Sequence, residues 1–172
     1  MPRNDVSVKI PISPKLTKDQ REVLADDIID YIVDRTKSGK GKNNRRWSGS
    51  KANVYSDSYK NSLDFKQKRS KRSVNLELSG DMLTALEAKN KKGEITIQIP
   101  HGASEWARAK GNILGSYGKK PNSSKARNFL ELGWSDMAKI EKMTPKNKLV
   151  DSYKEIKKIA KKVGDKEVKR GD

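Results

Sequence analysis

The feature that constrains this chain most is a capped amphipathic helix near its N-terminus. Thr17 and Gln20 have the spacing of a capping box, in which each side chain accepts a hydrogen bond from the other residue's backbone N–H. In the turns that follow, the apolar residues Leu24, Ile28, Tyr31 and Ile32 share one face, whereas Asp26, Asp27, Asp30 and Asp34 lie largely elsewhere. The pattern predicts a helix that ends near Ser38 and Gly39 and whose apolar face needs a second layer.

That second layer has to be built from little apolar material. Leu, Ile, Val and Phe make up about one fifth of the 172 residues, and the formal net charge is +17. This composition lies close to the level at which a highly charged chain stays disordered. We therefore expect one domain with a modest core that a partner surface completes, and we favour an assembly subunit or a nucleic-acid binder over a compact monomeric enzyme.

Residue types that are missing exclude several kinds of site. The chain has no cysteine, which rules out disulfides, thiolate chemistry and cysteine-ligated zinc or iron–sulfur centres. Its opening lacks the apolar core of a signal peptide, and no window approaches the roughly 20 apolar residues that a membrane helix needs. We expect synthesis in the cytoplasm and no membrane partner.

Two segments alternate apolar and polar residues in the manner of strands: residues 6–12, VSVKIPI, and residues 94–100, EITIQIP. The sequence NKKG predicts a hairpin loop that leads into the second of them, and VNLEL at residues 74–78 is also strand-like. Helical spacing of apolar residues appears around Tyr55 and Tyr59, over residues 103–114, after a cap at Ser135, and over residues 147–163.

These elements predict an α+β fold with a long N-terminal helix, a small antiparallel sheet and C-terminal helices around one core. Residues 1–164 are expected to form this single domain. Within it, residues 37–54 are rich in Gly, Ser, Asn and Lys, and we expect them to form a flexible basic loop or arm. Residues 165–172 are predicted to be a charged C-terminal tail.

Candidate reactive residues are few. His101 is the only histidine, and without cysteine it cannot build a usual transition-metal site. Ser79-Gly80-Asp81 does not match a nucleophile elbow, which needs glycines that flank a serine with one residue between on each side. We interpret Gly80 and Asp81 as a structural turn, in which Gly80 adopts a dihedral that other residues resist.

A metal-dependent nuclease deserves a test because the chain is basic. Glu87-Ala-Lys89, with Asp81 upstream, fits the carboxylate-x-lysine half of one nuclease pattern, but Glu155-Ile-Lys157 and Glu167-Val-Lys169 fit it equally well. The four helix aspartates are able to hold Mg²⁺ in principle, although a solvated face, or a face that meets a neighbour's lysines, explains them better. We predict no enzymatic activity, no metal and no cofactor.

Two basic clusters point to a polyanion or an acidic partner. The first contains Arg45 and Arg46, directly before Trp47, and the second contains Lys68, Arg69, Lys71 and Arg72. Lysine and arginine at this density attract phosphate backbones through counterion release, without reading sequence. Trp47 is suited to stacking on a base or to burial against a neighbouring subunit. A solvated loop that keeps the protein soluble is the alternative.

The order of several short motifs is more specific than any one of them. The motif residues are Arg35, Thr36 and Gly39; Tyr55, Ser56 and Tyr59; Leu76, Gly80, Met82, Leu83 and Leu86; and Arg127, Phe129, Leu130 and Leu132. This succession resembles small virion structural proteins of tailed bacteriophages, namely the neck, head–tail joining and tail-completion proteins, including the virion morphogenesis group. The matches span about three fifths of the chain.

The resemblance implies a non-enzymatic subunit of a homo-oligomeric ring, plausibly a hexamer, in the neck or tail of a virion. Its expected partners are other copies, neighbouring neck, connector or tail proteins, and the genomic DNA that passes through the channel. On this interpretation Trp47, Tyr55, Tyr59, Phe129 and Trp134 are interface or packing residues, with core packing within one subunit the alternative for each. Arg45, Arg46, Lys68, Arg69, Lys71 and Arg72 face DNA or an acidic neighbour.

Two other functions remain as alternatives. One is a free protein that binds nucleic acid without sequence specificity, and the other, less favoured, is a metal-dependent nuclease. A ring that forms without DNA supports the virion subunit, whereas a monomer whose DNA affinity collapses with salt supports the free binder.

Overall fold

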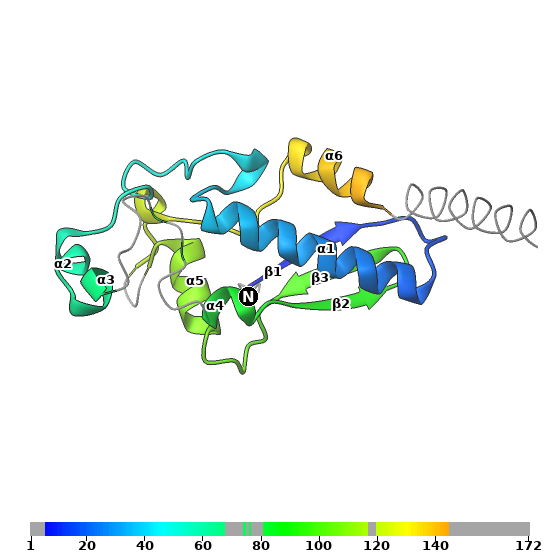
Figure 1. Cartoon of the computed structure of the whole chain (residues 1–172), viewed down its shortest axis with the longest axis horizontal. Coiled ribbons are helices and arrows are strands. Elements are labelled where there is room, and N and C mark those ends of the chain that lie inside the picture. The colour runs from blue at the N-terminus through cyan, green and yellow to red at the C-terminus, as the bar shows by residue number, and fades with distance from the viewer. Residues whose placement is uncertain (1–5, 68–73, 75, 77–80, 117–119, 145–172) are drawn as a thin grey trace, which may run out of the picture.

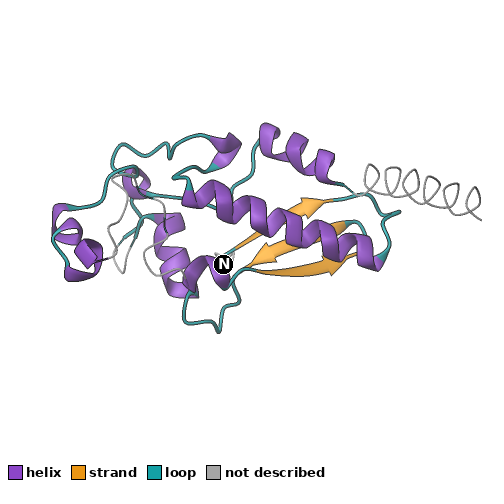
Figure 2. Ribbon diagram, viewed as in Figure 1, coloured by secondary structure: helices purple, strands orange, loops and turns teal. Residues whose placement is uncertain are grey.

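The computed structural model describes residues 6–67, 74, 76, 81–116 and 120–144. A three-stranded antiparallel sheet forms one layer, from β1 (Ser7–Pro11), β2 (Glu87–Lys91) and β3 (Glu94–Gln98), in the order β1-β3-β2 (Figure 1). The long helix α1 (Lys18–Lys37) lies across this sheet and forms the second layer (Figure 2). The predicted α+β class, with its long N-terminal helix and small antiparallel sheet, is confirmed.

The sheet buries one face, against α1. Ile10 pairs with Ile95 and Val8 with Ile97, so that apolar side chains of β1 and β3 alternate onto the same side. Ile95 and Ile97 are fully buried, whereas Lys9 on the opposite face is exposed. The strand predictions for residues 6–12 and 94–100 are confirmed, each with shorter bounds.

The second strand of the hairpin differs from the prediction. It is the charged segment EAKNK, β2, which is joined to β3 through Lys92 and Gly93, and Gly93 adopts a positive φ of 84°. Only Ala88 and Asn90 of this edge strand face the core, so its charged residues remain at the surface. In the strand-like VNLEL, Val74 and Leu76 are not in a strand, and the other three residues lie outside the described residues.

Both ends of α1 form as predicted. The Thr17 Oγ1 accepts a hydrogen bond from the Gln20 N–H at 3.2 Å, and the Gln20 Oε1 accepts one from the Thr17 N–H at 3.0 Å. Ser38 ends the helix, and Gly39 follows with a φ of 72°. The predicted apolar face is confirmed, because Leu24, Ile28 and Ile32 are fully buried against the sheet.

Short helices surround this two-layer unit. They are η1 (Lys42–Asn44), α2 (Asp57–Lys60), α3 (Leu63–Gln67), α4 (Asp81–Thr84), α5 (Trp106–Leu114), η2 (Ser123–Lys125) and α6 (Trp134–Met143). The helix predicted over 103–114 is α5, which starts three residues later, and the helix predicted around Tyr55 and Tyr59 is the pair α2 and α3. The helix predicted over 147–163 and the tail 165–172 lie outside the described residues.

The loop that follows α1 folds back onto its own subunit. The Trp47 side chain is 6% exposed, and Asn53 pairs with both the N–H and the C=O of Trp47. Lys51 donates its N–H to the Ser124 carbonyl at 2.8 Å. These contacts give the loop partners within its own subunit, because the indole finds a buried site and the peptide groups of the loop are paired. The flexibility predicted for residues 37–54 stays a prediction.

The packing of α1 makes a direct prediction about stability. We expect Ile28→Ala to lower the free energy of unfolding by about 2–5 kcal/mol, since it removes a fully buried side chain and leaves a cavity. Val23→Ala on the same helix is the control; Val23 is 48% exposed, and the expected decrease is within about 0.5 kcal/mol. Urea denaturation measures both values. Equal decreases would contradict the assignment of the buried face.

Candidate interaction surface

A buried ion pair connects α1 to α6. The guanidinium of Arg35, near the end of α1, lies 3.0 Å from the Asp136 carboxylate in the first turn of α6, and both side chains are fully buried. The Nη2 of Arg35 also donates to the backbone carbonyl oxygens of Phe129 at 2.6 Å and Glu131 at 3.2 Å. Arg35 therefore joins α1 to α6 and to the segment that leads into it.

The Asp136 carboxylate accepts from further donors. The Tyr31 hydroxyl, one turn before Arg35, donates to Oδ1 at 2.5 Å. The backbone N–H groups of Asn43 and Gly133 donate to Oδ2 at 2.6 and 2.8 Å. A buried carboxylate is tolerated only when it is paired and hydrogen-bonded in this way.

The network shifts the pKa values of its members in opposite directions. Burial alone raises the pKa of Asp136, but hydrogen bonds from Tyr31, Gly133 and Asn43 and the charge of Arg35 outweigh it, so the net pKa is lowered. Burial raises the pKa of Tyr31 to about 12, and its hydrogen bond to Asp136 and the charge of that carboxylate act in the same direction. Asp136 is therefore held charged and Tyr31 neutral.

The start of α6 is capped by a residue from a distant loop. Its N-cap, Gly133, has no side chain, and the Asn43 Oδ1 instead accepts from the Ser135 N–H at 3.0 Å and from the Ser135 hydroxyl at 3.2 Å. Asn43 has a positive φ of 57°, a conformation that asparagine tolerates better than most residues. The predicted cap at Ser135 is wrong, because Ser135 is the second helical residue and receives the cap.

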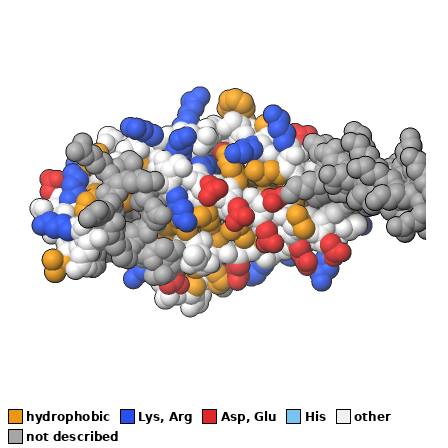
Figure 3. Space-filling view, in the orientation of Figure 1, with side chains coloured by type: hydrophobic (Ala, Val, Ile, Leu, Met, Phe, Trp, Pro, Cys, Tyr) orange, Lys and Arg blue, Asp and Glu red, His pale blue; other side chains and the backbone are white. Residues whose placement is uncertain are grey.

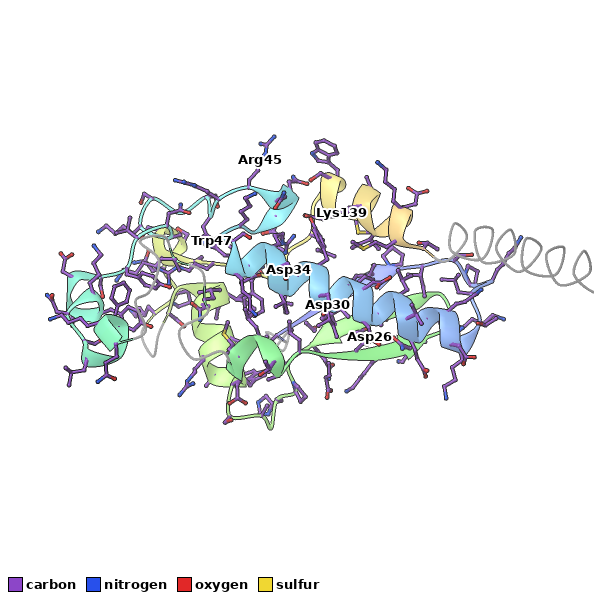
Figure 4. The ribbon with its side chains drawn as sticks, viewed as in Figure 1. Asp26, Asp30, Asp34, Arg45, Trp47 and Lys139 are labelled. Carbon is purple, nitrogen blue, oxygen red and sulfur yellow. The ribbon has the colours of Figure 1, made fainter. Side chains whose placement is uncertain are left out.

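Four exposed side chains lie around this joint, on η1 or just after it and at or just before the start of α6. Trp134 is 74% exposed, and Lys42 forms a surface ion pair with Glu131, with the Lys42 Nζ 2.6 Å from the Glu131 Oε1. Arg45 is exposed two residues beyond Asn43 and points away from the body of the molecule (Figure 4). We call Lys42, Arg45, Glu131 and Trp134 the Trp134 surface.

The predicted packing and interface aromatics divide between core and surface. Trp47, Tyr55 and Phe129 are buried within the subunit, so their role there is packing. Tyr59 is half-buried and forms a cluster with Tyr55 and Phe65, with ring centroids 5.1–5.7 Å apart. Trp134 alone among the five is largely exposed, which leaves it available to a partner.

Only some of the predicted basic and turn residues lie among the residues that the structure describes. Arg45 and Arg46 are exposed, as a contact with DNA or an acidic neighbour requires. Lys68, Arg69, Lys71 and Arg72 lie outside the described residues, and so does Gly80. Asp81 begins α4 and is followed by the buried residues Met82 and Leu83, which fits the predicted packing corner.

Sequence reasoning missed the buried network. Arg35 entered only as a motif residue, and Tyr31 only as part of an apolar face. The one available signal was Asp136 in the first turn of a predicted helix, where a carboxylate favours the positive end of the helix dipole. Nothing local linked it to Arg35, because the two residues are about 100 positions apart.

Comparisons with known proteins do not place the chain in a family: no family model, no curated protein and no solved structure matches it. Within the described residues, no group of three or more His, Asp or Glu side chains is arranged to hold a metal ion. No helix among those residues is long and apolar enough to cross a membrane.

The raised pKa of Tyr31 predicts a decrease in stability at alkaline pH. Because the pKa in the folded protein is about 12 and the ordinary value is 10.0, the stabilisation is complete below pH 10 and disappears as the pH rises toward 12. At pH 9 we expect Tyr31→Phe to be less stable than the wild type by on the order of 2 kcal/mol. The difference should narrow toward pH 12 in urea denaturation. A constant difference across this range would show that the pKa of Tyr31 is the same in the folded and the unfolded protein.

Proposed function

We propose that this protein is a structural subunit of a tailed-bacteriophage virion, in the neck, at the head–tail junction or at the tail end. It has no catalytic role and acts as a homo-oligomeric ring around or next to the DNA channel, plausibly a hexamer by resemblance. Its other partners are the neighbouring neck, connector or tail proteins. After synthesis in the host cytoplasm it becomes part of the virion.

The observation that carries this proposal is the meeting of distant motifs in one joint. Arg35, from the first motif, donates to the carbonyl oxygens of Phe129, in the last motif, and Glu131 beside it. Arg127, also from the last motif, donates its Nε–H to the Ala52 carbonyl at 2.7 Å. The residues that carry the resemblance therefore serve the architecture of the subunit and not a reactive site, as expected of a structural family.

The Trp134 surface supports a role in assembly. A tryptophan that is 74% exposed leaves a large apolar area in water, and tryptophan and arginine are the residues that contribute most often to binding hot spots. Its backbone is fixed by the Asn43 cap and by Asp136, so little further ordering is needed on binding. A rigid, exposed aromatic anchor of this kind is suited to a permanent protein partner.

The alternative is a free protein that binds nucleic acid without sequence specificity. The net charge of +17 and the exposed Arg45 and Arg46 favour it. An exposed tryptophan is also compatible with stacking on single-stranded bases. Location of the chain in the density of a purified particle decides between the two, because only a virion subunit has a fixed place there.

Substitution of Trp134 tests the assembly role. We expect Trp134→Ser to weaken self-association by at least about tenfold, since truncation of a central hot spot costs about 2 kcal/mol or more. Leu63→Ser is a matched control, because Leu63 is also 74% exposed but lies on α3. Native mass spectrometry over a concentration series measures the oligomers. Equal association of wild type and Trp134→Ser would remove the Trp134 surface from the interface.

Substitution of the exposed arginines tests the DNA-facing role. We expect Arg45→Ser with Arg46→Ser to lower the affinity for a short duplex and to reduce its salt dependence, by about 0.9 in log–log slope for each phosphate that the protein no longer neutralises. Lys9→Ser with Lys89→Ser, on the open face of the sheet, is the control with the same change in charge. Fluorescence anisotropy at several salt concentrations provides the slopes. If both pairs change the slope equally, the loop has no special role.

A further inference from the structure

Two segments of the chain are basic and contain no acidic residue. Residues 37–56 hold six Lys and Arg without a single Asp or Glu, and residues 106–130 hold another six on the same terms. All 22 Asp and Glu of the protein belong to the rest of the chain. The two segments are far apart in sequence, so the structure has to decide whether their charges act together.

The fold brings these two segments into contact. Lys51 donates its N–H to the Ser124 carbonyl at 2.8 Å, and Arg127 donates its Nε–H to the Ala52 carbonyl at 2.7 Å. Gly49 packs directly on the backbone of the second segment, where a Cβ atom on Gly49 would lie 2.5 Å from the Ser124 carbonyl oxygen. A larger residue would hold the segments apart, so the contact requires glycine at this position.

Exposed cations lie on both sides of this contact. Five of them are within four residues of Gly49 or Ser124, and none of the five forms an ion pair with another described residue. Glu131, the first carboxylate after residues 106–130, is already paired with Lys42 and does not offset their charge. We call these five residues the basic surface: Arg45, Arg46, Lys51, Lys120 and Lys125.

The loop between Trp47 and Asn53 adds uncharged donors to these cations. The Asn53 side chain closes the loop, because it pairs with both the N–H and the C=O of Trp47. Within the described part of the chain, the N–H groups of Ser48, Gly49 and Ser50 have no hydrogen-bond acceptor. Consecutive backbone N–H groups in a loop of small residues are suited to binding an anion such as a phosphate oxygen.

A phosphate backbone fits this surface better than an acidic protein does. Lys and Arg side chains, small polar side chains and backbone N–H groups are the groups that contact phosphates in protein–DNA complexes. A protein partner is selected by a pattern of both charges, whereas the basic surface carries one sign only. The carboxylates that repel DNA gather elsewhere: Figure 3 shows acidic side chains in a line over α1, and Figure 4 labels Asp26, Asp30 and Asp34 along it.

We propose that the basic surface binds the phosphate backbone of duplex DNA, with residues 45–51 and 120–125 in contact with the same duplex. The five cations neutralise phosphates, and the N–H groups of residues 48–50 donate to phosphate oxygens. The contact reads no base sequence. It rests on the proposed virion role, in which DNA passes next to the ring, but the experiments below use the purified protein and so test the contact separately.

Photo-cross-linking tests whether both segments touch the duplex. The chain has no cysteine, so a single thiol carries a benzophenone maleimide to one chosen position without a change in charge. Ser50→Cys and Ser123→Cys place the probe at exposed positions on the two segments. We expect both to cross-link to a labelled duplex, with yields that fall as the salt concentration rises. Val23→Cys on α1, where the native residue is 48% exposed, is the control and should give little cross-linking.

The salt dependence of binding tests the charges of the second segment. We expect Lys120→Ser with Lys125→Ser to lower the affinity for a short duplex and to reduce the log–log salt slope by about 0.9 for each phosphate that is no longer neutralised. Lys91→Ser with Lys92→Ser, exposed at the turn between β2 and β3, is the control with the same change in charge. Fluorescence anisotropy measures both slopes. Addition of Arg45→Ser and Arg46→Ser to the first pair should reduce the slope further, because each cation acts on its own phosphate.

Each outcome bears on the proposal. Cross-links from both positions, together with a larger change in slope for the Lys120 and Lys125 pair than for the control pair, support it. If only Ser50→Cys cross-links and the Lys120 and Lys125 pair behaves as the control does, the two segments do not share one duplex and the proposal is wrong. If polyglutamate displaces the labelled duplex as well as unlabelled duplex does, an acidic protein is the better partner and the proposal is also wrong.

Failure of this contact and failure of the virion role give different results. If neither position cross-links but the chain is located in a purified particle, the DNA contact is wrong and the virion role stands. If both positions cross-link but no particle contains the chain, the contact stands and the protein is a free binder of nucleic acid.

Discussion

The buried pair of Arg35 and Asp136 is the constraint on which the rest of the structure depends. Two buried charges are stable only if most of their hydrogen-bonding groups find partners. Here the fillers come from four separate places: Tyr31 on α1, the Asn43 and Gly133 peptides, and the carbonyl oxygens of the segment that leads into α6. Removal of any one of them leaves a hydrogen-bonding group of this buried pair without its partner. The segments that surround this ion pair therefore depend on one another for their positions.

This arrangement explains how a chain with little apolar material presents a rigid surface. The sheet and α1 supply a small core that includes Ile28, Ile95 and Ile97, and α6 adds Ile140 to it and is tied to α1 by the polar contacts of Asp136. Polar contacts are directional, so they fix the orientation of α6 more sharply than a small apolar patch would. Trp134 stays in water as a consequence, because the residue after it is tied to Asn43 and Asp136 holds the turn. The exposure of the Trp134 indole therefore results from the same hydrogen-bond network that attaches α6 to the rest of the core.

Local signals in the sequence were enough to predict the elements that carry them. The Thr17–Gln20 capping box, the alternation in β1 and β3 and the glycine after α1 each act within a few residues, and each is present. The features that could not be predicted depend on distant partners. β2 is a strand because β3 pairs with it, Gly133 works as an N-cap because Asn43 supplies the oxygen, and Arg35 is buried because Asp136 is there. No pattern within one segment contains that information.

The distribution of charge bears on the choice between an assembly subunit and a free binder of nucleic acid. A protein that only binds a phosphate backbone gains from one sign of charge on its surface, and an exposed acidic row weakens it by repulsion. This chain keeps Glu22, Asp26, Asp30 and Asp34 exposed on its longest helix, although its net charge is +17. An exposed acidic row repels a phosphate backbone and is suited instead to a basic surface on another protein. The exposed carboxylates on α1 therefore favour the proposed assembly subunit over a protein that only binds nucleic acid.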